Sequence, residues 1–329
     1  TTGGDGIDPD GYLATLDGAQ DQALSLEDTV TFVDVDAGDH EVELTGIAAH
    51  CAAAGSNPRT VAVIAGTVAS TSFTVTCAEL VLSNQIVAYR QGLGVYAMDA
   101  DGSNLFRIVS GLEPDVSRDG RKIVYDSGRD IWAANADGSG ETQLTIDPAV
   151  DSHPSWSPDG TRVAFASERD GNVEIWVMNA DGTGQVQLTD DPAGSTKPAW
   201  SPDGTRIAFN GGFDILLMTP DGSDVVNLTE TLGGGFTPAW SPDGTRIAFV
   251  SGAGGLDVYI MNSDGSGRVQ VTDNPAPDLE PTWSPDGLKL AFASERDGNF
   301  EIYTINVDGT GLTRLTDDPA DDRTPVWSP

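Results

Sequence analysis

The stretch His153-Pro-Ser-Trp-Ser-Pro-Asp-Gly160 decides the fold, because its central motif Trp-Ser-Pro recurs along the chain. Further copies begin at Trp200, Trp240, Trp283 and Trp327, at successive spacings of 44, 40, 43 and 44 residues. Short apolar runs surround each copy and are separated by Asp-Gly pairs, which favour tight turns between strands. A period of this length, with four short strands in each copy, is typical of a blade of a β-propeller.

The two ends of the repeat array complement each other. Residues 84–110 contain three predicted strands but no Trp-Ser-Pro strand, whereas residues 323–329 contain that strand alone. We therefore predict that Val326 and Trp327 pair with the segment Gln85–Tyr89 and close a six-bladed ring over residues 84–329, which hides two sheet edges. An open array with a truncated last repeat is the less economical alternative, because the missing strand and the surplus strand match.

The segments HPSWSPDGTRVAFAS, EIWVMNADGTG and VQLT, all from the repeat that contains Trp156, resemble repeats of TolB-type propellers, the WD-like family of bacterial envelope proteins. The resemblance covers about three quarters of the chain and implies a six-bladed ring with a central channel. It also implies, as one alternative for function, a periplasmic adaptor that binds a partner peptide at the channel. Similar repeats occur in oligopeptidases and in surface proteins, so the repeat is weak evidence for an activity. TolB carries an N-terminal α/β domain, whereas the N-terminal part of this chain has a different sequence pattern.

Residues 12–78 contain alternating and β-branched runs separated by Gly and Asp, which predict a small antiparallel β-sandwich. The stretches GDHEVELTGIAAHC and NPRTVAVIAGT resemble immunoglobulin-like or PEGA-like modules of bacterial surface proteins. Residues 1–11 are expected to be an extended Gly- and Asp-rich segment, and residues 79–83 a linker. The predicted fold class is all-β throughout.

The chain has two cysteines, Cys51 and Cys77, and both fall at predicted strand ends of the small module. A disulfide between them would close a loop of about 26 residues and stabilise so small a module by about 3 kcal/mol. We favour it over two buried thiols, and it predicts an extracytoplasmic location, secreted or on the cell surface, with the periplasm as the alternative. No apolar run approaches the length of a transmembrane helix, so membrane insertion is not expected.

The chain carries 51 acidic and 17 basic residues, a net charge of −34. Such a surface disfavours nucleic acid and anionic membranes as partners. Ca²⁺ is the cofactor that clustered carboxylates would hold. The candidate ligands form two groups, each of which could equally be a solvated linker or a hydrogen-bonded loop: Asp5, Asp8 and Asp10, and Asp317, Asp318, Asp321 and Asp322.

One position departs from the repeat in every copy, namely the residue before the proline of the Trp-Ser-Pro strand. Because first strands line the channel of a propeller, these residues are expected to ring one channel mouth and are the candidate binding residues. Variation of solvent-exposed side chains is the competing interpretation. The six residues are Glu113, His153, Lys197, Thr237, Glu280 and Thr324.

No catalytic constellation is visible: His40, His50 and His153 lie far apart, and no nucleophile elbow occurs. We therefore predict a non-catalytic extracellular or cell-surface scaffold that binds protein partners, including further copies of itself in a homo-oligomer or filament. The extended segment 1–11 is the candidate for such self-assembly, by adding a strand to another subunit's sheet. The adaptor named above and a glycan- or peptide-active enzyme are the alternatives.

Overall fold

The computed structural model describes residues 12–24, 31–45, 51–64, 67–77, 79–230, 233–252 and 255–329, and these residues form strands and turns only. The predicted all-β character is confirmed for this part of the chain, and no helix in it is available to cross a membrane. The chain divides into two compact units, a small one made mainly of residues 1–80 and a large one made mainly of residues 81–329.

The small unit contains two antiparallel sheets. The larger sheet has the order β2-β1-β3-β5, from Gln20–Leu24, Tyr12–Leu16, Gly38–Thr45 and Arg59–Val63. The smaller sheet pairs β4, Cys51–Ala53, with β6, Val75–Cys77. Leu44 from the first sheet and Val75 from the second are both buried in one apolar cluster, to which Phe73 adds. A packing of two sheets over a small core is what the alternating sequence of this region favours.

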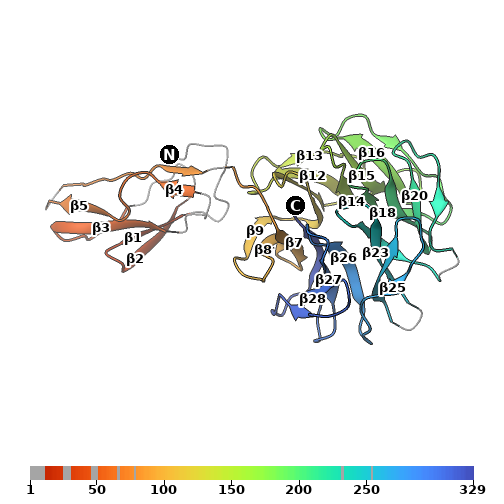
Figure 1. The fold of residues 1–329 in the computed structure, drawn as a ribbon. Coiled ribbons are helices and arrows are strands. Elements are labelled where there is room, and N and C mark those ends of the chain that lie inside the picture. The colour runs from red at the N-terminus through yellow and green to blue at the C-terminus, as the bar shows by residue number, and fades with distance from the viewer. Residues whose placement is uncertain are drawn as a thin grey trace. The chain divides into compact units, whose positions relative to one another are not determined.

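The large unit consists of six four-stranded antiparallel sheets, each ordered from a first to a fourth strand. Figure 1 shows these sheets arranged around a common centre. The first strands are β10 Leu112–Val116, β14 Asp151–Trp156, β18 Ser195–Trp200, β22 Phe236–Trp240, β26 Asp278–Trp283 and β30 Asp322–Trp327. The second strands are β11 Lys122–Ser127, β15 Arg162–Ser167, β19 Ile207–Gly211, β23 Arg246–Ser251, β27 Lys289–Ser294 and β7 Gln85–Arg90. The third strands are β12 Asp130–Asn135, β16 Glu174–Asn179, β20 Asp214–Met218, β24 Asp257–Asn262, β28 Glu301–Asn306 and β8 Gly94–Asp99. The fourth strands are β13 Thr142–Gln143, β17 Val186–Gln187, β21 Val226–Asn227, β25 Val269–Gln270, β29 Thr313–Arg314 and β9 Phe106–Val109.

The C-terminal strand β30 joins the sheet formed by the earliest strands of the large unit. It pairs antiparallel with β7, Val326 opposite Val87 and Trp327 opposite Ile86. A bidentate ion pair reinforces the other end of this pairing. Arg90 Nε donates to Asp322 Oδ1 and Arg90 Nη2 donates to Asp322 Oδ2, each at 2.7 Å. The first strands neighbour one another in chain order, and β30 neighbours β10.

Apolar side chains of adjacent sheets pack against each other and form the core of the large unit. Trp156, for example, lies with Val124 of the preceding sheet and Phe165 of its own sheet in one buried cluster. The tryptophans of the Trp-Ser-Pro motifs therefore fill the space between adjacent sheets. Four of them are only 4–8 % exposed: Trp156, Trp200, Trp283 and Trp327. The fifth, Trp240, is half-buried.

Candidate binding site at the hub of the large unit

The six residues that depart from the repeat occupy the same unusual backbone position in all six first strands. Each has a positive φ, between 46° for Glu113 and 56° for Glu280. The register of each first strand shifts at this point, because the next residue is a proline, which has no N–H to donate to the second strand. A bulge re-aims the side chain of the extra residue, and here all six side chains line one cavity.

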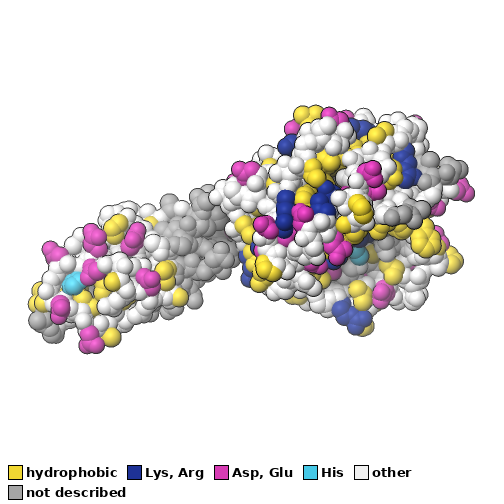
Figure 2. Space-filling view, turned by 90° about the horizontal axis from the view of Figure 1, so that it is seen from below, with side chains coloured by type: hydrophobic (Ala, Val, Ile, Leu, Met, Phe, Trp, Pro, Cys, Tyr) yellow, Lys and Arg dark blue, Asp and Glu magenta, His cyan; other side chains and the backbone are white. Residues whose placement is uncertain are grey.

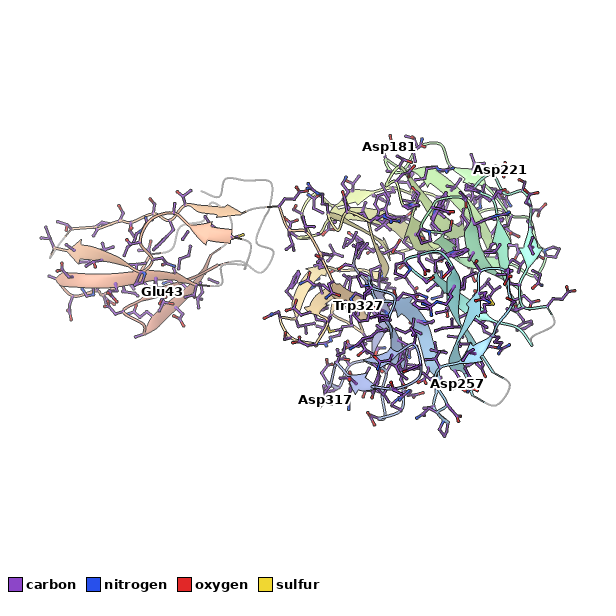
Figure 3. All side chains as sticks on the ribbon, in the orientation of Figure 1. Glu43, Asp181, Asp221, Asp257, Asp317 and Trp327 are labelled. Atoms are coloured by element: carbon purple, nitrogen blue, oxygen red, sulfur yellow. The ribbon has the colours of Figure 1, made fainter. Side chains whose placement is uncertain are left out.

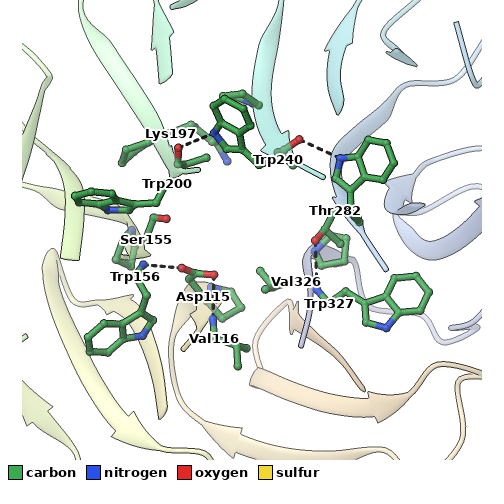
Figure 4. Close-up of a pocket in the computed structure, with 18 of the residues that line it drawn as sticks. Asp115, Val116, Ser155, Trp156, Lys197, Trp200, Trp240, Thr282, Val326 and Trp327 are labelled. Atoms are coloured by element: carbon green, nitrogen blue, oxygen red, sulfur yellow. Dashed lines mark hydrogen bonds between the residues drawn. The ribbon is translucent and has the colours of Figure 1, made fainter. Parts of the chain in front are cut away.

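This hub cavity has a volume of about 480 Å³ and is lined by the first strands of all six sheets. Figure 4 shows the labelled indoles of Trp156, Trp200, Trp240 and Trp327 around it. Its wall is made mostly of prolines and small side chains, so it is largely apolar along its length. We call the end lined by the six residues that depart from the repeat the charged end. The end lined by the prolines of the Trp-Ser-Pro motifs is the proline end.

Lys197 spans the charged end of the cavity. Its Nζ lies 3.1 Å from Glu113 Oε2 and 3.2 Å from Glu280 Oε1, and the three side chains are 20–27 % exposed. The strands that carry them, β10, β18 and β26, alternate among the six first strands, so both ion pairs cross the cavity. Burial would raise the pKa of Glu113, but Lys197, His153 and Arg323 together outweigh burial, and the net effect lowers that pKa. Burial would likewise lower the pKa of Lys197, but the two glutamates raise it.

The remaining departing residues complete the charged end. His153 Nε2 lies 3.6 Å from Glu113 Oε2, and burial lowers the pKa of His153 to about 4, so the imidazole is neutral at neutral pH. The backbone N–H groups of Thr237 and Thr324 donate to Asn210 Oδ1 at 2.9 Å and to Glu280 Oε2 at 2.8 Å. These bonds satisfy donors that the bulge removes from the ladder.

Two further carboxylates near this cavity have raised pKa values. Burial, followed by the charge of Glu113, raises the pKa of Asp126 to about 7. Burial raises the pKa of Asp115 to about 6, although Asp115 accepts backbone hydrogen bonds from Trp156, at 2.7 Å, and from Val116, at 3.0 Å (Figure 4). Two carboxylates that change protonation close to neutral pH therefore lie near the cavity, in addition to the ion pairs at its charged end.

Sequence reasoning missed two sets of residues that line the hub cavity. The first set is the residue before each tryptophan position, which also varies between repeats: Asp115, Ser155, Ala199, Ala239, Thr282 and Val326. The second is Arg118, which stands where the other repeats have a proline. Arg118 Nη1 donates to the carbonyl oxygen of Pro202 at 2.8 Å and so reaches past the intervening strand β14 at the proline end. Both sets break the repeat, so the signal was present in the sequence.

The predicted acidic calcium ligands at the C-terminal end face arginines. Arg314 lies 2.7 Å from Asp317, Arg323 lies 3.0 Å from Asp321, and Arg90 pairs with both Asp318 and Asp322. Guanidinium groups thus already supply positive charge to all four carboxylates, and no group of three metal-ligating side chains occurs in the described part of the chain. Asp5, Asp8 and Asp10 lie outside the described residues. The Ca²⁺ prediction therefore stays a prediction.

The two cysteines lie in the smaller sheet of the small unit. Cys51 in β4 is directly opposite Cys77 in β6 in an antiparallel register. Directly opposed residues of such a pair have Cα atoms about 4.5–5.5 Å apart, within the range that a disulfide spans. The backbone arrangement is compatible with the predicted disulfide, which stays a prediction.

Comparison with known proteins gives a consistent fold. The family model described as TolB beta propeller domain matches residues 82–229 and 215–329. TolB from Acinetobacter baumannii is similar with a TM-score of 0.68 and 22 % identity, over 77 % of this chain and 68 % of that one. A protein described as TolB from Agrobacterium tumefaciens gives 0.61 and 22 %, over 72 % and 89 % of the two chains. An oligogalacturonate lyase from Vibrio parahaemolyticus gives 0.51 and 16 %, over 72 % and 80 %. A search of the curated proteins found no match.

Proposed function

We propose, from the fact that this chain belongs to the TolB beta propeller domain family, that it is a non-catalytic interaction module whose hub cavity binds a segment of a partner protein. The observation that carries the proposal is the cavity itself, about 480 Å³ in volume and lined at equivalent positions by all six sheets. The repeat keeps the scaffold constant, while the lining residues before each proline and each tryptophan vary. Variation in the lining of a concave site is what a specific binding surface requires.

The chemistry of the lining favours a chain segment as the ligand. The volume lies within the range of ordinary ligand sites, which is about 300–1,000 Å³, and accommodates a few side chains. Prolines, Ala199 and Ala239 offer apolar contact along the wall, while Lys197 and the glutamates offer charged groups at one end. An extended peptide carries both kinds of group in alternation.

The charged end is poorly arranged for catalysis. Glu113 and Glu280 both accept from Lys197, so neither carboxylate is free to act as a base or a nucleophile while this ion pair holds. The imidazole of His153 has Ser152 as a neighbour, at 2.9 Å, but that contact lies within one strand. A glycan- or peptide-active enzyme remains the alternative class. A broad substrate screen with a Glu113→Gln, Glu280→Gln variant would reveal it through an activity that the variant lacks.

Three further features belong to the proposal. The large unit is a six-bladed ring closed by Val326 and Trp327, supported by the β30–β7 pairing. Residues 12–78 form an immunoglobulin-like sandwich, supported by the two sheets of the small unit. The protein works outside the cytoplasm, supported by the opposed positions of Cys51 and Cys77.

Self-assembly through the N-terminal segment is proposed separately, because residues 1–11 lie outside the described residues. It predicts that the native protein sediments as oligomers or filaments in the presence of calcium. Removal of residues 1–11 should reduce the assemblies to monomers. A chain that is monomeric at high concentration with and without this segment would contradict the self-assembly proposal and leave the hub-cavity proposal intact.

The hub-cavity proposal is tested by filling the cavity. An Ala199→Trp, Ala239→Trp variant places two indoles in the wall, and it should lose a partner that the native protein retains from an envelope extract. Val186→Arg on the outer strand β17 is the matched control, because Val186 is 54 % exposed and remote from the cavity. Equal capture of the same partners by both variants, each folded by circular dichroism, would overturn the proposal.

A further inference from the structure

The charged end of the hub cavity holds two carboxylates for one lysine. Glu113 and Glu280 both accept from Lys197 Nζ, at 3.1 Å and 3.2 Å. His153, which lies 3.6 Å from Glu113, is neutral at neutral pH because burial lowers its pKa to about 4. These four side chains therefore carry one negative charge in excess, in a place where none of them is more than 27 % exposed.

The charged groups around this cluster do not remove the excess. Arg323 acts on Glu113, but it forms its own ion pair with Asp321 at 3.0 Å and so adds no net charge. Asp126 stands opposite Leu112 in the pairing of β10 with β11, and it adds a further carboxyl group beside Glu113. Burial and the charge of Glu113 raise the pKa of Asp126 to about 7, and a cation bound nearby would favour its ionised form.

The two glutamates flank the strand β30, which lies across the cavity from Lys197. β30 neighbours both β10, which carries Glu113, and β26, which carries Glu280. Figure 4 shows Lys197 and Val326 of β30 on opposite sides of the cavity. The residue of β30 at the charged end is Thr324, and its backbone N–H donates to Glu280 Oε2 at 2.8 Å. Lys197 thus reaches the carboxylates from one side, and Thr324 lies between them on the other.

Hydrogen-bond acceptors on the side of Thr324 are left without a donor. Thr324 Oγ1 is buried and has no partner in the described part of the chain. Lys197 and His153 both lie at Oε2 of Glu113, and no hydrogen bond among the described residues reaches its Oε1. Glu280 Oε2 accepts the N–H of Thr324 and keeps a second lone pair. A primary ammonium group has three donors and no acceptor, so it matches these three oxygens in number and in charge.

We infer that the charged end of the hub cavity binds a primary ammonium group of a partner protein, between Glu113, Glu280 and Thr324. Lys197 shows from the opposite side that the same two carboxylates accept an ammonium. A metal ion is the poorer occupant, because the described residues contain no group of three His, Cys, Asp or Glu side chains that could hold one. That the ammonium belongs to the segment held in the hub cavity rests on the proposed function, whereas the site itself does not.

The test uses two amines at constant ionic strength, Nα-acetyl-lysine methylamide for a side chain and glycine methylamide for an N-terminus. Each is titrated into the ²H,¹⁵N-labelled full chain, and the backbone N–H signal of Thr324 is the readout, because that N–H is bonded to Glu280. The signal should shift saturably, with a dissociation constant on the order of 1 mM for the tighter amine, which identifies the source of the ammonium. The Nε-trimethylated lysine derivative keeps the charge but has no N–H at the ammonium, and it should bind at least about tenfold more weakly.

Two threonine variants separate this site from the rest of the cavity. Thr324→Val removes the unpartnered hydroxyl and should weaken binding about fivefold at the signal of residue 324. Thr237→Val is the matched control, because Thr237 has the same positive φ and also a buried hydroxyl without a partner among the described residues. Its strand β22 lies between those of Lys197 and Glu280, so its loss should leave binding unchanged. Glu113→Gln, which removes one of the two charges, should weaken binding at least about tenfold.

The remaining backbone signals show that each variant is folded. Equal binding of the trimethylated derivative, equal effects of the two threonine variants, or the absence of a saturable shift with both amines would each overturn the inference. Since no partner protein is used, failure of the hub-cavity proposal would not affect the result.

Discussion

Lys197 determines the charge balance at one end of the hub cavity. It is the cation shared by Glu113 and Glu280, from strands that are not neighbours, and the three side chains are only 20–27 % exposed. Removing one partner of such a cluster leaves the others facing like charge in a poorly solvated place. The partial exposure reduces the effect through solvent screening.

We predict that Lys197→Met lowers the free energy of unfolding at pH 7 by about 1–2 kcal/mol. The folded-state pKa of Glu113 is lowered, so its contribution to stability is present above the unfolded value and is lost as pH falls through the folded value. The difference between variant and native protein should therefore shrink below about pH 4. Urea unfolding at several pH values measures it.

Lys289→Met is the matched control for this prediction, because Lys289 is exposed at the start of β27. Its effect should stay within about 0.5 kcal/mol. Equal losses in both variants would show that the ion pairs across the cavity contribute nothing specific.

The candidate residues were predictable because they break a repeat, but their partners were not. Glu113, Lys197 and Glu280 stand out in the sequence as changes at one position of the Trp-Ser-Pro strand. Their contact depends on which strands face each other across the cavity and on side-chain reach, and a one-dimensional pattern contains neither. Likewise, the hydrogen bond from Arg118 to the carbonyl oxygen of Pro202, which passes one intervening strand, is visible only in the three-dimensional structure.

At the scale of the element, the Asp-Gly turns owe their stability to one carboxylate oxygen. In the turn after β22, Asp243 Oδ1 accepts from Ser241 Oγ at 2.6 Å, from Thr245 N at 3.0 Å and from Thr245 Oγ1 at 2.8 Å. The same arrangement recurs at the periphery, where Figure 3 places Asp181 and Asp221 in turns between third and fourth strands. These turns account for part of the acidic excess of the chain.

Replacing Asp243 by Asn should lower the free energy of unfolding at pH 7 by less than about 1 kcal/mol, because the amide oxygen accepts the same bonds without the charge and solvent screens the charge of this exposed side chain. The folded-state pKa of about 2 lies below the ordinary pKa of an aspartate, about 3.9, so this contribution is full above about pH 4 and is lost as pH falls toward 2. Native and variant stabilities should converge near pH 2. Asp190→Asn, an exposed change between sheets, is the control, and a constant difference at all pH values would contradict the account.

The opposed cysteines allow a prediction for the smaller sheet. If Cys51 and Cys77 form the predicted disulfide, reduction should destabilise the small unit by about 3 kcal/mol and leave the large unit unchanged. Calorimetry with and without a reductant would show one transition move while the other stays. Alkylation of two free thiols in the untreated protein, measured by mass, would contradict the disulfide.

At the scale of the whole molecule, the surface charge limits the kinds of partner. The net charge is −34, yet Figure 2 shows basic, acidic and apolar side chains interspersed on the large unit. Such a mixture permits local contacts with a protein, while the overall field opposes nucleic acid. The hub cavity, with Lys197 at its charged end, is such a local feature.

The pairing of β30 with β7 could be predicted because it is a matter of counting strands, and it can be tested as a binding reaction. Removal of residues 322–329 leaves the N–H and C=O groups of Gln85–Arg90 without their ladder partner and removes the ion pair of Arg90. It also removes Trp327 from its apolar cluster. The shortened chain should therefore unfold at a markedly lower temperature than the native protein.

A synthetic peptide of sequence DRTPVWSP should restore the lost stability in trans. A ligand that binds only the folded chain stabilises it by mass action, by about 2.7 kcal/mol at one hundred times its dissociation constant. The unfolding temperature should rise with peptide concentration, whereas the peptide DRTPAASP, which lacks the Val326 and Trp327 side chains, should have little effect. If the two peptides act alike, the side chains of Val326 and Trp327 do not contribute to this pairing. If the shortened chain unfolds at the native temperature, the last strand does not hold the six sheets together. Either result would contradict the prediction, because it requires the stability of the six sheets to depend on the side chains that pack at this pairing.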